Sequence, residues 1–309
     1  MPRTALSRLG VVAFATALGC AGDARPTALA DEAIDASFAD VPSATVRGGG
    51  GGNVGGGGSS GGGSSGGGSS GDASTSSGCR STAILVVDRS GSMRDSTLDG
   101  AQKWSALLSA LESVLPRIED RVSLGLVMFP QSGAAGGCGL RATLDLEPQL
   151  HAASAILSRL RSSPPDGPTP TAGAVEVAGG WFASHPGAEG QRYVILATDG
   201  APNCNAALSP ESCVCGHSGS SCLWGVNGSL QCLDDVRTVA TIGEVRRQSV
   251  FTYVIGLNGA ESFSNVLDAM ADAGGRARAA TPRFYPANTA SELSSEFSTV
   301  TSDIANGCP

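Results

Sequence analysis

The pattern of apolar and polar positions divides the chain from residue 79 onward into apolar runs and amphipathic stretches. The apolar runs are typical of buried strands and span residues 83–87, 122–129, 193–197 and 250–257. Shorter runs at 140–146 and 282–285 predict two further strands, the first of them at a sheet edge. Helical spacing of apolar residues predicts helices at 96–115, 150–160, 172–183, 233–247, 262–273 and 290–304. Strands that alternate with helices predict an α/β fold with a doubly wound, mostly parallel sheet flanked by helices.

The first 78 residues show neither pattern. Residues 1–19 combine Arg3 and Arg8 with a short apolar run, which is typical of a signal peptide. Cys20 follows in the context Ala-Leu-Gly-Cys, which resembles a bacterial lipoprotein signal, so we expect Cys20 to carry a lipid. The alternative is cleavage after Ala30, which would release a secreted protein. Residues 20–78 are dominated by Gly and Ser toward their end and predict a disordered tether.

These features predict three parts: the signal peptide, the lipid-anchored tether and one folded domain over residues 79–309 with a cysteine-rich insertion at 203–232. We expect the protein to be exported to a bacterial cell envelope, as an outer-membrane lipoprotein. The formal net charge of −8 and the lack of a basic cluster argue against nucleic acid as a partner. Lys103 is the only lysine, which excludes a Gly-Lys-Ser/Thr phosphate loop.

Oxygen-bearing side chains follow two of the predicted central strands. Asp88, Ser90 and Ser92 come directly after the first strand, and Asp199 comes directly after the strand at 193–197. The carboxyl ends of parallel strands share one edge of a sheet, where ligands bind in open α/β folds. Thr169 lies in a Gly-Pro-Thr-Pro-Thr loop that precedes a predicted helix. Hydroxyl and carboxylate oxygens suit a hard cation such as Mg²⁺, with Ca²⁺ or Mn²⁺ as alternatives.

The three segments, in this order, resemble the von Willebrand factor A domain and its metal-ion-dependent adhesion site. The resemblance covers the whole folded part, and it implies that Ser90, Ser92 and Thr169 ligate the metal while Asp88 and Asp199 anchor it, often through water. It also implies an open coordination position that takes a carboxylate from a protein partner. Thr171 would either hold a water of the site or cap the following helix. We expect Arg89 to be a solvated loop charge.

Eight cysteines remain besides Cys20, and an even number in an exported protein indicates disulfides. Cys79 and Cys308 should both reach the amino-terminal end of the sheet, so we predict that they pair. The other six are Cys138, Cys204, Cys213, Cys215, Cys222 and Cys232. Their connectivity stays open, although parity joins Cys138 to one cysteine of the insertion. A zinc site that includes His217 is the less favoured alternative.

The sequence therefore predicts a surface-tethered, metal-dependent adhesion or protein-binding module. One alternative is a structural envelope protein whose metal only stabilises loops. A metal-dependent hydrolase is less favoured, because His151 and His185 fall on helix flanks, where surface or packing roles are expected. In integrin relatives the last helix slides when metal coordination changes. A Cys79–Cys308 bond would oppose such sliding, so we expect a site of fixed affinity.

Overall fold

The computed structural model describes residues 80–131, 140–204 and 233–307. In chain order the strands are β1 (Ser81–Asp88), β2 (Val122–Phe129), β3 (Leu146–Gln149), β4 (Gln191–Thr198), β5 (Val250–Leu257) and β6 (Tyr285–Ala287). The α-helices are α1 (Lys103–Ile118), α2 (Ala153–Arg161), α3 (Thr171–Ser184), α4 (Asp235–Arg247), α5 (Ser264–Gly274) and α6 (Ala290–Asn306). Two short 3₁₀ turns, η1 (Gly91–Arg94) and η4 (Ala260–Phe263), precede α1 and α5. No helix of the described residues is long and apolar enough to cross a bilayer.

The strands form one sheet of six in the order β3-β2-β1-β4-β5-β6. Every neighbouring pair is parallel except β2 and β3, which are antiparallel. The predicted α/β fold with a doubly wound, mostly parallel sheet is therefore confirmed. Because β1 is flanked by β2 on one side and by β4 on the other, the chain reverses its direction of travel across the sheet at β1. In open α/β sheets this reversal opens a crevice at the carboxyl ends of the two central strands.

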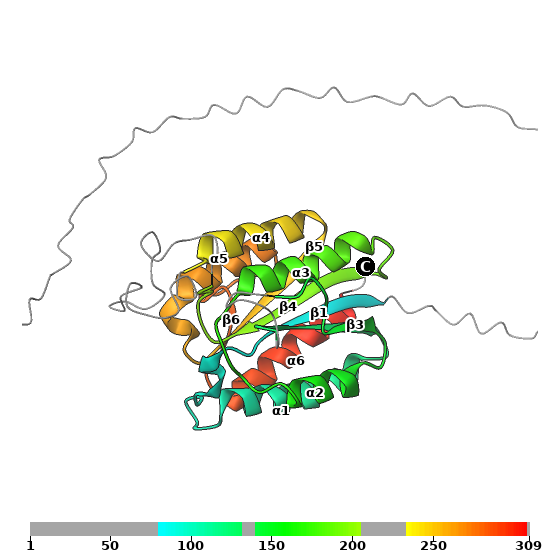
Figure 1. The fold of residues 1–309 in the computed structure, drawn as a ribbon. Helices are drawn as coiled ribbons and strands as arrows, with labels where there is room; N and C mark the ends of the chain where they lie inside the picture. The colour runs from blue at the N-terminus through cyan, green and yellow to red at the C-terminus, as the bar shows by residue number, and fades with distance from the viewer. Residues whose placement is uncertain (1–79, 132–139, 205–232, 308–309) are drawn as a thin grey trace, which may run out of the picture. The chain divides into compact units, whose positions relative to one another are not determined.

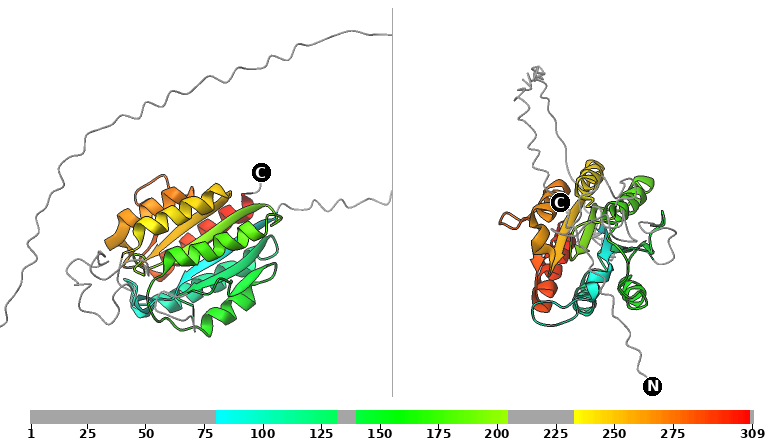
Figure 2. Two further views of the ribbon diagram at one scale, coloured as in Figure 1. Left: turned by 45° about the horizontal axis from the view of Figure 1, so that its top comes forward. Right: turned by 60° about the vertical axis from the view of Figure 1, so that its left-hand side comes forward.

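Helices cover both faces of the sheet, with α1, α2 and α6 on one face and α3, α4 and α5 on the other (Figure 1). The two further views show α4 and α5 side by side in their layer (Figure 2). Alternate residues of β1 feed the two cores: Ala83, Leu85 and Val87 face the first layer, and Ile84 and Val86 face the second. A strand that is buried on both faces explains the unbroken apolar run of the sequence.

The helix α1 begins at Lys103 and not near Ser96 as the apolar spacing predicted. Residues Ser96 and Gln102 pair across a tight turn that closes at Gly100, whose φ is 82°. Only glycine adopts this left-handed backbone without strain, so the turn displaces the first helical turn. Leu98, which falls within the predicted helix, lies on this turn with 72% of its surface exposed.

The predicted edge strand at 140–146 is wrong, because the edge strand β3 covers Leu146–Gln149. The reason lies at Asp145, whose backbone N–H donates to the Leu126 carbonyl at 2.8 Å. Its carboxylate accepts from the Met128 backbone N–H at 2.7 Å and thereby takes the place of a strand carbonyl. The regular strand consequently begins only at Leu146, after this irregular contact.

Other helices and strands deviate from the predicted bounds by a few residues. The helix α1 continues through Pro116 to Ile118, since burial of Leu115 and Ile118 outweighs one lost backbone hydrogen bond. The last strand, β6, forms at 285–287 and not at 282–285.

Candidate metal centre

The candidate site lies at the carboxyl edge of β1 and β4, the two central strands. Their register pairs Val87 with Ala197, so the next residues, Asp88 and Thr198, end the two strands side by side. Asp199 follows Thr198 directly. The short turn η1 then carries Ser92 back over the strand ends. The topology thus brings together carboxylates that lie 111 positions apart by residue number, from Asp88 to Asp199.

Asp88 is fully buried, and both of its carboxylate oxygens accept hydrogen bonds. The Ser90 backbone N–H donates to Oδ1 at 2.7 Å, and the Thr198 hydroxyl donates to Oδ2 at 2.6 Å. Burial raises the pKa of Asp88 to about 7, and the negative charge of Asp199 contributes to the same direction. A nearby cation would favour the ionised form of this carboxyl group.

Asp199 is held by a hydroxyl and by an ammonium group. The Ser92 Oγ donates to Oδ1 at 2.8 Å, and the Lys103 Nζ donates to Oδ2 at 2.8 Å. The hydroxyls of Ser90 and Ser92 lie 3.1 Å apart. A continuous chain of hydrogen bonds therefore joins Ser90, Ser92 and Asp199, and the backbone of Ser90 connects it to Asp88.

Thr169 completes the predicted set from the loop that precedes α3. It lines a pocket of about 280 Å³ together with Ser92, Lys103 and Asp199. The loop that carries Thr169 is fixed by Asn203, because the Thr169 backbone N–H donates to the Asn203 Oδ1 at 2.9 Å and the Asn203 N–H donates to the Thr169 carbonyl at 3.2 Å. The structure thus brings all five sequence-predicted residues to one place.

Thr171 lies at the first position of α3 and is fully buried. Its Oγ1 has no hydrogen-bond partner, and the cap position of α3 belongs to Pro170. The prediction that Thr171 caps the helix through its side chain is therefore wrong. Since a buried hydroxyl without a partner is costly, Thr171 is suited to a water or ion ligand beside Thr169.

Arg89 is not the solvated loop charge that the sequence suggested. It is buried, and its guanidinium donates to the Pro130 carbonyl at 2.6 Å and to the Pro164 carbonyl at 2.7 Å. The backbone N–H of Asp166 donates to the Arg89 carbonyl at 2.7 Å. Burial lowers the pKa of Arg89. Arg89 thus ties the loop after β1 to the loops that follow β2 and precede α3.

The oxygen set fits a hard divalent cation. Two carboxylates and the hydroxyls of Ser90, Ser92 and Thr169 provide only oxygen ligands, which Mg²⁺ prefers. Among the described residues, no three His, Cys, Asp or Glu side chains gather into a group that could hold a metal. A cation here would therefore depend on hydroxyls and water as well as on carboxylates, and it would keep part of its positive charge.

Residues 83–201 match the family model of the von Willebrand factor type A domain. The match and the fold together support a von Willebrand factor A domain. The matched residues include both carboxylates of the candidate site and all three of its hydroxyl residues.

Solved structures of similar fold include the pilus adhesin SpaC from Lactobacillus rhamnosus GG, with 17% identity and a TM-score of 0.54. That match covers 74% of this chain and 31% of SpaC. The PilB minor pilin from Streptococcus sanguinis has 16% identity and a TM-score of 0.55, with 76% of this chain and 63% of PilB covered. The chain thus spans less than two thirds of the length of each of these proteins. A search of curated proteins found no match.

Four further residues belong to the candidate site and were not predicted from the sequence: Lys103, Asn203 and Gly259, which line the pocket, and Thr198, which donates to Asp88. Thr198 and Asn203 lie close in sequence to the predicted residue Asp199. This proximity could have indicated them, although the motif assigns them no role. Lys103 and Gly259 come from α1 and from the loop after β5, and no spacing in the sequence relates them to the site.

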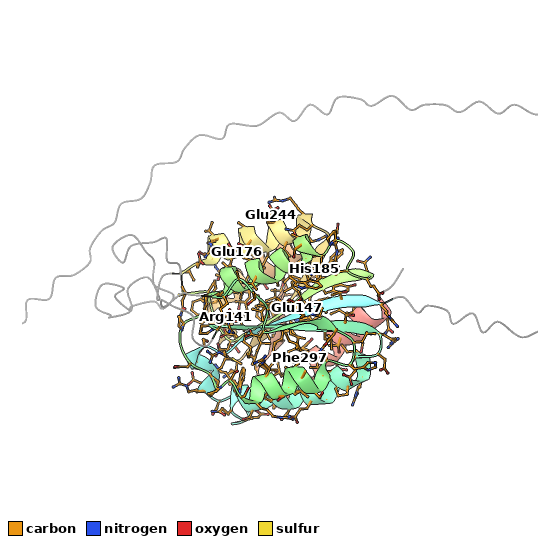
Figure 3. All side chains as sticks on the ribbon, turned by 45° about the vertical axis from the view of Figure 1, so that its right-hand side comes forward. Arg141, Glu147, Glu176, His185, Glu244 and Phe297 are labelled. Atoms are coloured by element: carbon orange, nitrogen blue, oxygen red, sulfur yellow. The ribbon has the colours of Figure 1, made fainter. Side chains whose placement is uncertain are left out.

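The two described histidines lie away from the pocket of the domain. His151 Nδ1 is 3.2 Å from the Asp120 carboxylate. His185 lies at the end of α3 (Figure 3). Its ring stacks on Trp181 with 4.3 Å between ring centroids. Both have the surface and packing roles that the sequence predicted, and neither lines the pocket. His217 and the zinc alternative lie outside the described residues.

Most cysteines of the chain also lie outside the described residues. The exception is Cys204, which is buried next to Asn203. The hydroxyl of Ser81 donates to the Ile304 carbonyl at 3.2 Å, so the end of α6 lies beside the start of β1. That is the arrangement from which the Cys79–Cys308 pair was predicted. The pair itself stays a prediction, as do the lipid on Cys20 and the signal and tether segments.

Proposed function

We propose that the chain is a cell-surface, metal-dependent adhesion or protein-binding module. The observation that carries the proposal is the hydrogen-bonded chain of Ser90, Ser92 and Asp199 beside Asp88, with Thr169 lining the same pocket as Ser92 and Asp199. These are the oxygen ligands that the resemblance assigns to the metal-ion-dependent adhesion site. The pocket supplies room for an ion and for a ligand group beside it.

The proposed residue roles follow from the contacts. Ser90, Ser92 and Thr169 offer neutral hydroxyl oxygens, while Asp88 and Asp199 are held by other groups and would anchor the cation or its waters. When bound, Mg²⁺ would act as a Lewis-acidic centre for an incoming carboxylate. Because hydroxyls neutralise no charge, the centre would attract an acidic side chain of a protein partner.

The surface location is part of the proposal. The fold neighbours SpaC and PilB bear the names of a pilus adhesin and a minor pilin. The predicted lipid on Cys20 and the Gly/Ser tether would hold the domain away from a membrane while leaving it free to reorient. A binding module rather than an enzyme agrees with the positions of the two described histidines.

A capture experiment with a matched pair of variants tests the function. The mature chain is immobilised and exposed to cell-envelope extracts in Mg²⁺ or in chelator. We expect a bound protein in Mg²⁺ that is lost in chelator and in Asp88→Asn. The control is Asp95→Asn, since Asp95 lines the same pocket but is exposed and is outside the predicted ligand set.

The outcomes separate the candidate functions. Mg²⁺-dependent capture by wild type and Asp95→Asn, but not by Asp88→Asn, supports adhesion. Stabilisation by Mg²⁺ without any captured protein would favour a structural metal site. Turnover of a substrate that depends on Asp88 would favour the hydrolase alternative.

A further inference from the structure

Lys103 places a positive charge inside the candidate metal centre. Its Nζ is 2.8 Å from the Asp199 Oδ2, and the two side chains are only 6% and 1% exposed. Both groups also line the pocket in which the cation would bind. Because this pair is buried, solvent screens it less than a surface pair, so the ammonium repels any cation held by Asp199.

The loop after β5 leaves space for the ammonium group of Lys103. Gly259, in the loop after β5, has a φ of 104°, and a side chain there would begin 3.4 Å from the Lys103 Nζ and 3.1 Å from the Asp199 carbonyl oxygen. The first residue of α1 therefore meets the ends of β4 and β5 at this point. The Lys103–Asp199 ion pair is therefore a buried part of the pocket wall and not a surface contact.

We propose that Lys103 is a resident counter-cation that weakens metal binding and keeps the occupied centre electropositive. The inference rests on the proposed function, because it concerns the same cation. Asp88 and Asp199 offer two negative charges when ionised, and Lys103 cancels one of them. A divalent cation then exceeds the summed charge of Asp88, Asp199 and Lys103 by one. Arg89 is also buried, but it donates to the carbonyls of Pro130 and Pro164 and does not line the pocket, and its positive charge adds to the same excess. Asp95 also lines the pocket, but it is exposed, so solvent screens its contribution.

The charge of Lys103 affects binding of the partner as well as binding of the metal. Without Lys103, two carboxylates would balance a divalent cation and remove its attraction for an anion. With Lys103, the occupied centre carries an excess positive charge toward the open position. The site is thus adapted to a carboxylate ligand, and the cation is held less tightly than two unopposed carboxylates would hold it.

Titration with Mn²⁺, followed by electron paramagnetic resonance, tests this inference on the whole mature chain. The test variant is Lys103→Met, which keeps the length of the side chain and removes the charge. We expect Mn²⁺ to bind roughly tenfold tighter or more, as neighbouring charges commonly shift proton equilibria by that factor. The matched control is Arg94→Met, which removes an exposed positive charge from η1 and should change the affinity by less than about threefold.

A second readout distinguishes electrostatics from a merely structural role. The metal-free Lys103→Met protein should melt at a lower temperature than wild type, because Asp199 loses its partner, and Mn²⁺ should raise its melting temperature by more than it raises that of wild type. Unchanged or weaker Mn²⁺ binding in Lys103→Met, with wild type binding the ion, overturns the inference but leaves the metal site intact. If neither protein binds Mn²⁺, both the inference and the proposed function are refuted. Binding by Lys103→Met alone would support the weakening of metal binding by Lys103, but it would contradict the proposed function, which requires the wild-type centre to hold the cation.

Discussion

At the scale of single residues, buried charge is the main property of the candidate site. Asp88, Arg89, Lys103 and Asp199 are all buried within the loops at the carboxyl edge of the sheet. Each of them has hydrogen-bond partners, and only the Lys103–Asp199 pair is a direct contact between opposite charges. Changes at these positions should therefore affect metal binding and stability together.

The raised pKa of Asp88 predicts a pH-dependent metal affinity. The pKa of about 7 lies above the ordinary value of 3.8, so below pH 7 the folded protein holds a proton that the cation must displace. We expect the affinity for Mn²⁺ to fall by up to about tenfold per pH unit below pH 7 and to be nearly constant above it. Titrations between pH 5.5 and 8 would show this.

The same shift has a consequence for the metal-free protein. A raised pKa makes the contribution of Asp88 to stability largest at low pH, and that contribution is lost as the pH rises from about 4 to about 7. In Asp88→Asn this part of the pH dependence should disappear from chemical denaturation curves. An unchanged pH profile in this variant would contradict the assignment.

Arg89 is predicted to matter through the loops that it joins. Arg89→Met leaves the carbonyls of Pro130 and Pro164 without donors, so unfolding free energy should drop by about 2 kcal/mol or more. The affinity for Mn²⁺ should fall as well, because the loop with Ser90 loses its attachment. Arg161→Met, which breaks an exposed ion pair with Glu112, is the control and should cost less than about 1 kcal/mol.

At the scale of secondary structure, the loop after β5 contains Gly259, a glycine with a positive φ that lines the pocket. In Gly259→Ala the left-handed backbone should cost about 1–2 kcal/mol, and the new methyl group would crowd the Asp199 carbonyl. We expect lower stability and weaker Mn²⁺ binding. Gly243→Ala is the matched control, since nothing lies within 4 Å of its added carbon in α4 and alanine favours helices. A stable Gly259→Ala with normal Mn²⁺ binding would contradict this role.

The last helix, α6, is attached at both ends. At its start, the Ala290 N–H donates to the Asp99 carboxylate at 3.2 Å, and the Leu98 N–H donates to the Asn288 carbonyl at 2.8 Å. Near its end, Asp303 accepts a hydrogen bond from the buried hydroxyl of Tyr253. These contacts oppose sliding of the helix and agree with the expected site of fixed affinity.

A helix that does not slide gives a measurable prediction. Amide hydrogen exchange in α6 should be the same with and without Mg²⁺, while exchange in the loops around Ser90 and Thr169 should slow down. Tyr253→Phe should lower the unfolding free energy by about 1 kcal/mol through loss of the bond to Asp303. A Mg²⁺-dependent change of protection along α6 would show that the helix moves.

At the scale of the described domain, metal binding should appear as stability. A ligand that binds only the folded state stabilises it by about 2.7 kcal/mol at a concentration of one hundred times its Kd. We expect the melting temperature to rise with the concentration of Mg²⁺ in wild type and in Asp95→Asn. Asp88→Asn should show no such rise, and a rise in that variant would place the ion elsewhere.

The sequence by itself determined the layered α/β fold, because short unbroken apolar runs that alternate with amphipathic stretches indicate strands covered on both faces. It also determined the residues of the candidate centre, since Asp88 and Asp199 each end a strand and parallel strands share an edge. The alternation of strands and helices along the chain was sufficient for the fold, while the full ligand set with Thr169 followed from the resemblance to the von Willebrand factor A domain.

Only the tertiary structure decided which other charges meet these ligands. Lys103 binds Asp199 across 96 positions of sequence. Arg89 is buried because its guanidinium donates to the carbonyls of two loops, at Pro130 and Pro164. Local spacing also predicted wrong bounds for two segments. The Ser96–Gln102 turn, with Gly100, displaces the start of α1, and the Asp145 carboxylate delays the start of β3. Burial of a charge depends on partners that converge only when distant segments pack together, and no periodicity along the chain records them.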